Sequence, residues 1–264
     1  MATIRPFRPL RPRPELAQSV ASAPYDVITT SEARALAAGN PNSYLRVIRS
    51  EIEFPDEVDP YSDAVYQRAA ENLKELLDRG VLFRDSEPGL FAYQIEMDGR
   101  VQTGLFGTVS LDEYESGITK KHETTRQDKE DDRTRHLLGM GVQPGPVYLT
   151  YRGLPALDAR YEAEVQGPPL YDVTTETGVG HRIWRVADAS GWTKAFESVP
   201  CLYVADGHHR IASAARTRAR LRAENPQHTG MESYNFVLAA VFPHTELRIL
   251  PYNRVIRRLT LSNE

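Results

Sequence analysis

The chain has 264 residues, a net charge of −4 and one cysteine, Cys201. This length is enough for one large domain or two small ones around a sizeable core, and a single cysteine excludes a disulfide framework and suits a reducing cytoplasm. There is no long basic run and no apolar stretch of about 20 residues, so we expect neither nucleic acid nor a membrane as partner.

The first ninety residues predict an N-terminal α/β segment. The proline- and arginine-rich start breaks any hydrophobic core of a signal peptide, so we expect a cytoplasmic protein. A helix is clearest over 61–79, where apolar residues recur at helical spacing and Gly80 suits the position after the last turn. The other elements expected here are an extended start over 4–12, an ordered loop or strand over 22–28, a helix capped by Thr30 or Ser31 and ending near Gly39, a turn over 40–42 and a strand over 44–49.

From residue 91 onward, strands and helices interleave and hairpins are frequent. Asp98-Gly99 between two strand-like runs is a strong hairpin signal. The elements expected in this part are strands over 91–97 and 104–111, a charged helix over 124–138, a strand over 146–151, a second hairpin over 170–174 and 181–186, a helix over 190–198, a strand over 201–205, a helix over 208–224 and a strand over 235–242. This pattern favours an α+β fold with a mixed sheet, with residues 1–90 packed on a core formed by 91–264.

The most informative unit is Asp206-Gly207-His208-His209-Arg210, which follows a short apolar strand and opens a helix. The first N–H groups of a helix lack internal partners and the helix dipole adds positive charge, so this start can bind an anion. Gly207 lets the backbone approach a phosphate, and Arg210 adds a forked donor. His208 and His209 can donate protons or hydrogen bonds, and Asp206 can hold magnesium or orient a histidine. The alternative is a helix start that Asp206 merely caps, with exposed histidines.

A second candidate segment precedes the charged helix. Glu123 is a candidate general base and His122 a candidate phosphate or metal contact. Arg126, Lys129 and Arg133 recur at i, i+3 and i+7 and so form a stripe that could face polyphosphate. The alternative is a solvated helix with local ion pairs. A metalloprotease motif is excluded, because Arg126 stands where the second histidine would be required.

Tyr25 and Asp26 form a third, weaker candidate. They either line a pocket or belong to a turn with an aspartate cap.

The chain resembles two related groups of proteins. Asp-Gly-His-His-Arg after a strand looks like the signature of the ParB/sulfiredoxin-like fold, in whose free-serine kinases the motif lies beside the nucleotide and a magnesium ion. Nearly the whole chain resembles the domain of unknown function 1015 family. The motifs that it shares with this family are Ala23-Pro24-Tyr25-Asp26-Val27-Ile28, His122-Glu123-Thr124 with Asp132-Arg133, Gly145-Pro146-Val147-Tyr148 and Val204-Ala205-Asp206-Gly207-His208-His209-Arg210.

The resemblance adds three implications. Glu123, His122 and Arg133 would belong to the nucleotide site, and members of the family are longer, so the core would continue beyond residue 264. Sulfinic-acid reduction is not expected, because sulfiredoxin needs a cysteine where this chain has His208, and Cys201 suits a buried strand position.

The leading hypothesis is phosphoryl transfer from ADP or ATP, with Mg²⁺, to a small hydroxyl substrate, free L-serine being the best guess. Such transfer requires positioning and charge stabilisation. The roles would be proton acceptance by Glu123, metal binding by Asp206, catalysis assisted by His209, and phosphate binding by His122, Arg133, Gly207, His208, His209 and Arg210. The alternatives are a nucleotide-gated regulatory protein without chemistry, and a metal-dependent hydrolase that uses Asp206, His122, His208 and His209.

Overall fold

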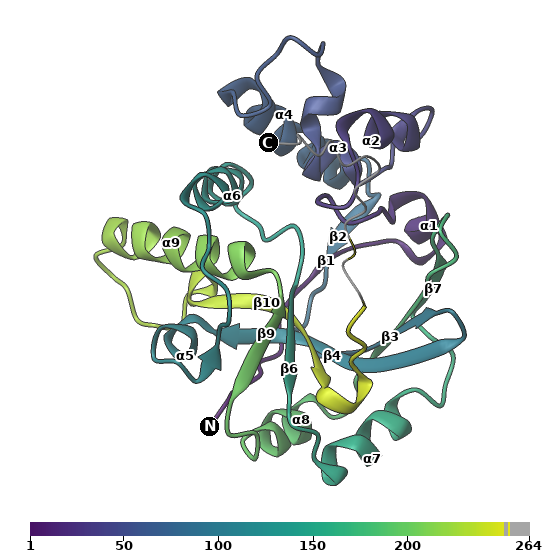
Figure 1. Ribbon diagram of the computed structural model, residues 1–264, viewed down its shortest axis with the longest axis vertical. Coiled ribbons are helices and arrows are strands. Elements are labelled where there is room, and N and C mark those ends of the chain that lie inside the picture. The colour runs from purple at the N-terminus through teal and green to yellow at the C-terminus, as the bar shows by residue number, and fades with distance from the viewer. Residues whose placement is uncertain (251–252, 254–264) are drawn as a thin grey trace, which may run out of the picture.

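An eight-stranded mixed sheet forms the centre of the computed structural model, which describes residues 1–250 and 253 (Figure 1). The end of the expected core, 251–252 and 254–264, lies outside the described residues. The strands are β3 (Phe91–Met97), β4 (Arg100–Ser110), β5 (Thr119–Lys120), β6 (Val147–Tyr151), β7 (Tyr171–Thr174), β8 (Gly180–Arg185), β9 (Leu202–Asp206) and β10 (Phe236–Pro243). They lie in the order β5-β9-β6-β10-β4-β3-β8-β7. Only β5 with β9 and β6 with β10 pair in parallel among the described strands, so the predicted α+β class with a mixed sheet is confirmed.

Both predicted hairpins are present. Asp98 and Gly99 connect β3 to β4 with φ values of 53° and 73°, the left-handed conformation at both central positions that the tightest hairpin turns require. The second hairpin joins β7 to β8 through a turn that includes Gly178, whose φ is 81°. A separate two-stranded antiparallel sheet pairs β1 (Leu10–Pro12) with β2 (Leu82–Arg84) and so fastens the start of the chain.

The helices surround the sheet and extend away from it at one end (Figure 1). They are α1 (Ala17–Val20), α2 (Thr30–Ala37), α3 (Leu45–Ile48), α4 (Asp63–Asp78), α5 (Leu111–Glu115), α6 (Gln127–Met140), α7 (Pro155–Glu164), α8 (Ala189–Phe196) and α9 (His208–Glu224), with short 3-10 turns η1 (Pro14–Leu16), η2 (Ser50–Glu53), η3 (Ser233–Asn235) and η4 (His244–Glu246). The main core combines sheet residues with Trp192 and Phe196 of α8 and Ile211 of α9. Ala2 and Ile4 at the start of the chain are also part of this core.

Helices α1 to α4 form a group that we call the N-terminal unit (residues 13–81), and two predictions about it were wrong. The cap of α2 is Thr29, which forms a reciprocal capping box with Glu32, and not Thr30 or Ser31. Residues 44–49 form the one-turn helix α3 instead of a strand. Leu45 and Val47 are buried, and their alternation imitates a strand because one turn is too short to reveal helical periodicity.

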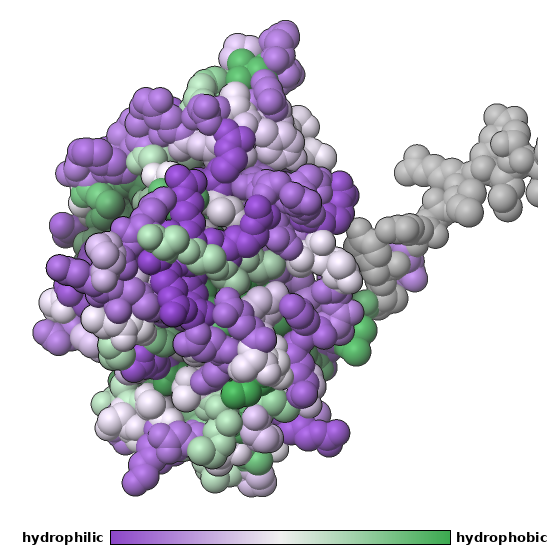
Figure 2. Space-filling model, turned by 90° about the vertical axis from the view of Figure 1, so that its left-hand side faces the viewer, coloured by the Kyte–Doolittle hydropathy of each residue, from purple (hydrophilic) through white to green (hydrophobic). Residues whose placement is uncertain are grey.

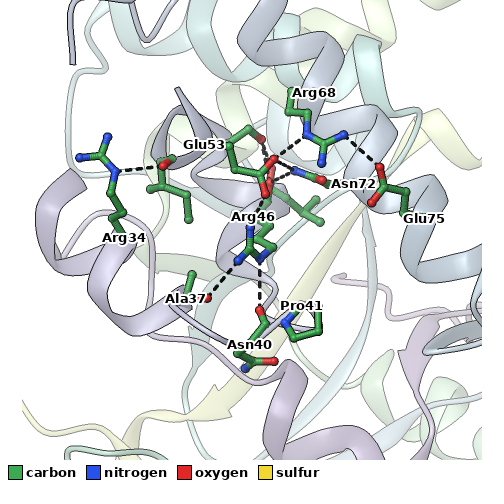
Figure 3. A network of polar contacts seen from close by, with 12 residues as sticks. Arg34, Ala37, Asn40, Pro41, Arg46, Glu53, Arg68, Asn72 and Glu75 are labelled. Carbon is green, nitrogen blue, oxygen red and sulfur yellow. Dashed lines mark hydrogen bonds and ion pairs between the residues drawn. The ribbon is translucent and has the colours of Figure 1, made fainter. Parts of the chain in front are cut away.

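An ionic network holds α3, η2 and α4 together (Figure 3). The carboxylate of Glu53 accepts hydrogen bonds from Arg46, from Nε of Arg68 at 2.5 Å and from Nδ2 of Asn72 at 3.1 Å. These bonds lower the pKa of Glu53 against the opposing effect of its partial burial, which is the largest single influence. Because charge-assisted bonds are the stronger ones, this carboxylate adds to the apolar packing of α3 against α4 and ties η2 to both helices.

Helix α6 lies between α4 and α9, where it joins the N-terminal unit to the sheet (Figure 1). Hydrophilic residues dominate the face of the molecule that carries α6 and α9, and hydrophobic residues lie in small groups among them (Figure 2). No helix in the described part of the chain is long and apolar enough to cross a membrane.

Candidate functional site

The turn between β9 and α9 has the backbone geometry that the sequence predicts. Strand β9 ends at Asp206 and α9 begins at His208, so the predicted strand and helix are both confirmed. Gly207 lies between them as the N-cap with φ of 90°, which L-residues rarely adopt. No side chain in the described chain caps the first turn of α9. Its N–H groups therefore remain available to an anion, as expected of an uncapped helix start.

The side chain of Arg210 is engaged with the protein at both ends of its fork. Nη1 donates to the carbonyl oxygen of Pro146, and Nη2 donates to Oδ2 of Asp206 at 2.6 Å. Oδ2 of Asp26 lies 3.8 Å from the same Nη2 atom. Arg210 thus ties the turn to the residue that precedes β6. A phosphate could bind both Nη atoms of Arg210 only by replacing these acceptors.

Glu123 lies beside His208, although the two residues are far apart in the sequence. Oε2 of Glu123 is 3.4 Å from Nδ1 of His208, and the His122 ring meets the His208 ring edge to face with centroids 4.5 Å apart. Burial, and next the neighbouring His122, lower the pKa of His208, so this imidazole is neutral at pH 7. Its Nε2 atom is buried and has no hydrogen-bond partner within the described residues. The group therefore combines an exposed carboxylate with a neutral, partly unsatisfied imidazole.

His209 contacts the start of α6. The backbone N–H of Arg126, which is the N-cap of α6, donates to Nε2 of His209 at 3.2 Å. Ser213, one turn further along α9, donates to the carbonyl oxygens of His209 and Glu130. In this geometry His209 connects the two helices, and its predicted catalytic role stays a prediction.

Arg133 is held by two tyrosines of the N-terminal unit, by Tyr25 directly and by Tyr66 through Asp132. Its Cζ atom lies 4.4 Å from the ring centroid of Tyr25, and its Nε donates to the Tyr25 hydroxyl at 3.3 Å. It also pairs with Asp132, whose Oδ1 accepts a hydrogen bond of 2.6 Å from the Tyr66 hydroxyl. Cζ of Arg210 lies 5.9 Å from the same Tyr25 ring, so one aromatic side chain contacts both arginines.

The predicted cationic stripe of α6 does not act as a unit. Arg126 pairs with Asp128 on its own helix, and Lys129 donates to the Tyr61 hydroxyl at 3.2 Å. Among the described side chains of these three residues, only that of Arg133 approaches the β9–α9 turn, through Tyr25, whereas Arg126 contacts His209 through its backbone N–H. Sequence reasoning also missed Tyr66, for which no local motif exists, and left the role of Tyr25 open.

Asp206 is the residue that could hold a magnesium ion. Mg²⁺ in phosphate sites is often bound by one or two carboxylates together with phosphate oxygens and water. The Asp206 side chain is 66% exposed, and only its Oδ2 pairs with Arg210. This donor suits Mg²⁺ delivered with a nucleotide. Within the described residues, no group of three or more His, Cys, Asp or Glu side chains is arranged to bind a metal ion on its own.

Comparison with known proteins identifies one family. Residues 4–264 match the family described as protein of unknown function (DUF1015). No curated protein and no solved structure matches the chain.

Proposed function

The chain belongs to the DUF1015 family, and we propose that it binds the phosphates of ADP or ATP at the start of α9 and transfers a phosphoryl group to a small hydroxyl compound. Its core would be a nucleotide-binding core of the ParB/sulfiredoxin-like kind. The acceptor to test first is free L-serine, because the Asp-Gly-His-His-Arg motif is similar to that of the free-serine kinases of that fold.

One observation carries the proposal: the Glu123 carboxylate lies 3.4 Å from His208 at the uncapped start of α9. Free backbone N–H groups favour phosphate there, and a carboxylate beside them can accept a proton. A site that only bound nucleotide would need no such carboxylate. The contact brings together a residue that precedes α6 and the first residue of α9, which sequence spacing alone does not require.

The proposed reaction assigns a role to each group. Glu123 accepts the proton of the acceptor hydroxyl, whose oxygen forms the new bond to phosphorus as the bond to the leaving phosphate oxygen breaks. The first N–H groups of α9 and the Arg133 side chain stabilise the negative charge on the transferred group. Mg²⁺, when bound with the nucleotide at Asp206, would supply further neutralisation of phosphate charge. The products would be the phosphorylated acceptor and AMP or ADP.

A regulatory nucleotide-binding protein is the second candidate, and the engaged fork of Arg210 favours it. Both Nη atoms of this residue bind protein acceptors, so nucleotide binding would have to rearrange the turn. Such a rearrangement is what a ligand-driven switch needs. The metal-dependent hydrolase gains no support from the described residues, which hold no ready cluster of metal ligands.

The test combines binding with product detection. The protein is incubated with Mg²⁺, with ADP or ATP, and with a panel of amino acids and polyols that includes L-serine, and products are identified by mass spectrometry. A phosphorylated acceptor that forms with the wild type but not with Glu123→Gln supports the kinase. Tight nucleotide binding without any product in the whole panel favours the regulatory protein, and absence of nucleotide binding contradicts both.

A further inference from the structure

A cavity of about 230 Å³ lies in the N-terminal unit, between helix α4 and the loop that precedes α3. Arg46, Glu53, Arg68 and Asn72 of the network in Figure 3 line it, together with Arg79, the residue that follows α4. These residues belong neither to the β9–α9 turn nor to its neighbours. The cavity is therefore separate from the proposed phosphate site.

The ionic network leaves two polar atoms at the cavity without a partner among the described residues. Ser43 and Asn72 line the cavity and are 3% and 4% exposed. The Ser43 hydroxyl makes no hydrogen bond within the described residues, and no donor there reaches Oδ1 of Asn72. The amide orientation is fixed, because Nδ2 of Asn72 donates to two acceptors, the Arg46 carbonyl oxygen at 2.7 Å and the Glu53 carboxylate at 3.1 Å. Both residues line the cavity, so these two atoms are available to a molecule bound there.

The charges indicate what kind of molecule fits. Glu53 pairs with both Arg46 and Arg68, and Arg68 pairs in addition with Glu75 at 2.9 Å. Arg79 has no carboxylate partner in the described part of the chain, and it donates instead to the Pro41 carbonyl and the Asn42 side chain. Three arginines and two glutamates line the cavity, which leaves a surplus of one positive charge. The surplus matches one negative charge on a ligand.

We propose that this cavity binds a small carboxylate that carries an adjacent amino or hydroxyl group. The Ser43 hydroxyl and Arg79, which would exchange its bonds to Pro41 and Asn42, would bind the carboxylate. Oδ1 of Asn72 would accept a hydrogen bond from the ammonium or hydroxyl group. A volume of about 230 Å³ is below that of pockets for drug-sized molecules and suits an acid of three or four carbons. The site is independent of phosphotransfer.

The proposal is tested with L-alanine, which has no hydroxyl group and so cannot serve as a phosphoryl acceptor. Calorimetric titration should detect binding of L-alanine and of lactate. Acetate lacks the second donor and ethanolamine lacks the carboxylate, so both should bind at least about tenfold more weakly. Failure of L-alanine and lactate to bind at millimolar concentration overturns the proposal.

Two variants assign the binding to the cavity. Arg79→Gln should weaken L-alanine binding about ten- to a hundredfold, because a charge-assisted contact is lost. Ser43→Ala should weaken it about three- to tenfold and leave the melting temperature unchanged, since the hydroxyl has no partner in the protein. Lys74→Gln removes a cation from an α4 position outside the cavity and should bind as the wild type does. Equal binding by all of these proteins, or loss of binding only in Arg210→Gln, would place the ligand elsewhere and overturn the proposal.

Discussion

The ring of Tyr25 lies against the guanidinium group of Arg133, with 4.4 Å between Cζ and the ring centroid. This contact brings a loop of the N-terminal unit to the β9–α9 turn. Arg49, whose side chain is largely buried, holds that loop by donating to the carbonyl oxygens of Tyr25 and Ile28 at 2.6 and 2.8 Å. The loop is thus anchored on one side and contacts both arginines of the candidate site on the other.

Replacement of Tyr25 should therefore weaken nucleotide binding without unfolding the protein. Tyr25→Leu removes the ring that orients Arg133 and Arg210, and cation–π contacts are worth about 0.5–2 kcal/mol, so affinity for ADP or ATP should fall about three- to thirtyfold. Tyr25→Phe keeps the ring and loses only the hydroxyl that accepts the 3.3 Å bond from Arg133, so its affinity should fall less than that of Tyr25→Leu. Calorimetric titration measures both. Equal affinities for Leu and Phe would show that the ring does not position the arginines.

Glu123→Gln separates chemistry from binding. The substitution keeps the size of the side chain but removes the proton acceptor beside His208, so turnover should fall about 10²–10⁴-fold while nucleotide affinity stays nearly unchanged. Steady-state kinetics with the best acceptor and calorimetry with the nucleotide give the two quantities. Glu176→Gln, at an exposed position in the turn between β7 and β8, is the matched control. Full activity of Glu123→Gln would remove Glu123 from the mechanism.

The elements around the candidate site could be predicted because each carries its own local signal. The apolar run before Asp206, the glycine and the helical spacing after His208 are all contiguous, and β9 and α9 follow them closely. Helix α7 was missed, although Pro155 at its first position and buried Leu157 and Tyr161 four residues apart are helix signals.

Side-chain partners were harder to predict than elements, because they depend on tertiary packing. Arg210 was expected to offer its guanidinium donors to a phosphate. In the fold, the Pro146 carbonyl accepts a hydrogen bond from one of them, and it comes within reach only when β6 pairs with β9. The contact of Tyr25 with Arg133 likewise joins residues from separate parts of the chain. Only the resemblance of Glu123 to a family motif pointed toward its contact with His208.

Gly207→Ala tests the strained turn. An alanine there would keep φ near 90° at a cost of about 1–2 kcal/mol, and its Cβ atom would lie 3.2 Å from Nε of Arg210. The free energy of unfolding in urea should drop by about that amount, and nucleotide affinity should fall as well. Gly145→Ala is the control, since its Cβ would meet no atom within 4 Å and its φ is not in the left-handed region. If Gly207→Ala and Gly145→Ala had equal free energies of unfolding, the turn would accommodate an alanine without loss of stability.

His136 lies on α6 where this helix meets the N-terminal unit, and its protonation should make stability depend on pH. Its Nε2 atom is 3.1 Å from the Val47 carbonyl oxygen of α3, and the Tyr66 ring of α4 lies nearby. The pKa of His136 is lowered from 6.5 to about 4, chiefly by burial and also by Arg133, against opposing effects of the Val47 carbonyl and Glu51. The folded protein thus favours the neutral imidazole, whereas the unfolded chain takes up a proton near pH 6.5.

Stability should therefore fall as the pH drops below 6.5, and this loss should be complete below about pH 4. Between pH 7.5 and pH 5 the expected loss from His136 is about 2 kcal/mol, at 1.36 kcal/mol for each pH unit below 6.5. His136→Gln keeps a donor for the Val47 carbonyl and removes the titration, so its urea unfolding free energy should vary less over this range. Some dependence should remain, because burial also lowers the pKa of His208 and acts in the same direction. If wild type and His136→Gln lose equal stability, protonation of His136 does not destabilise the packing of α6 against α3 and α4.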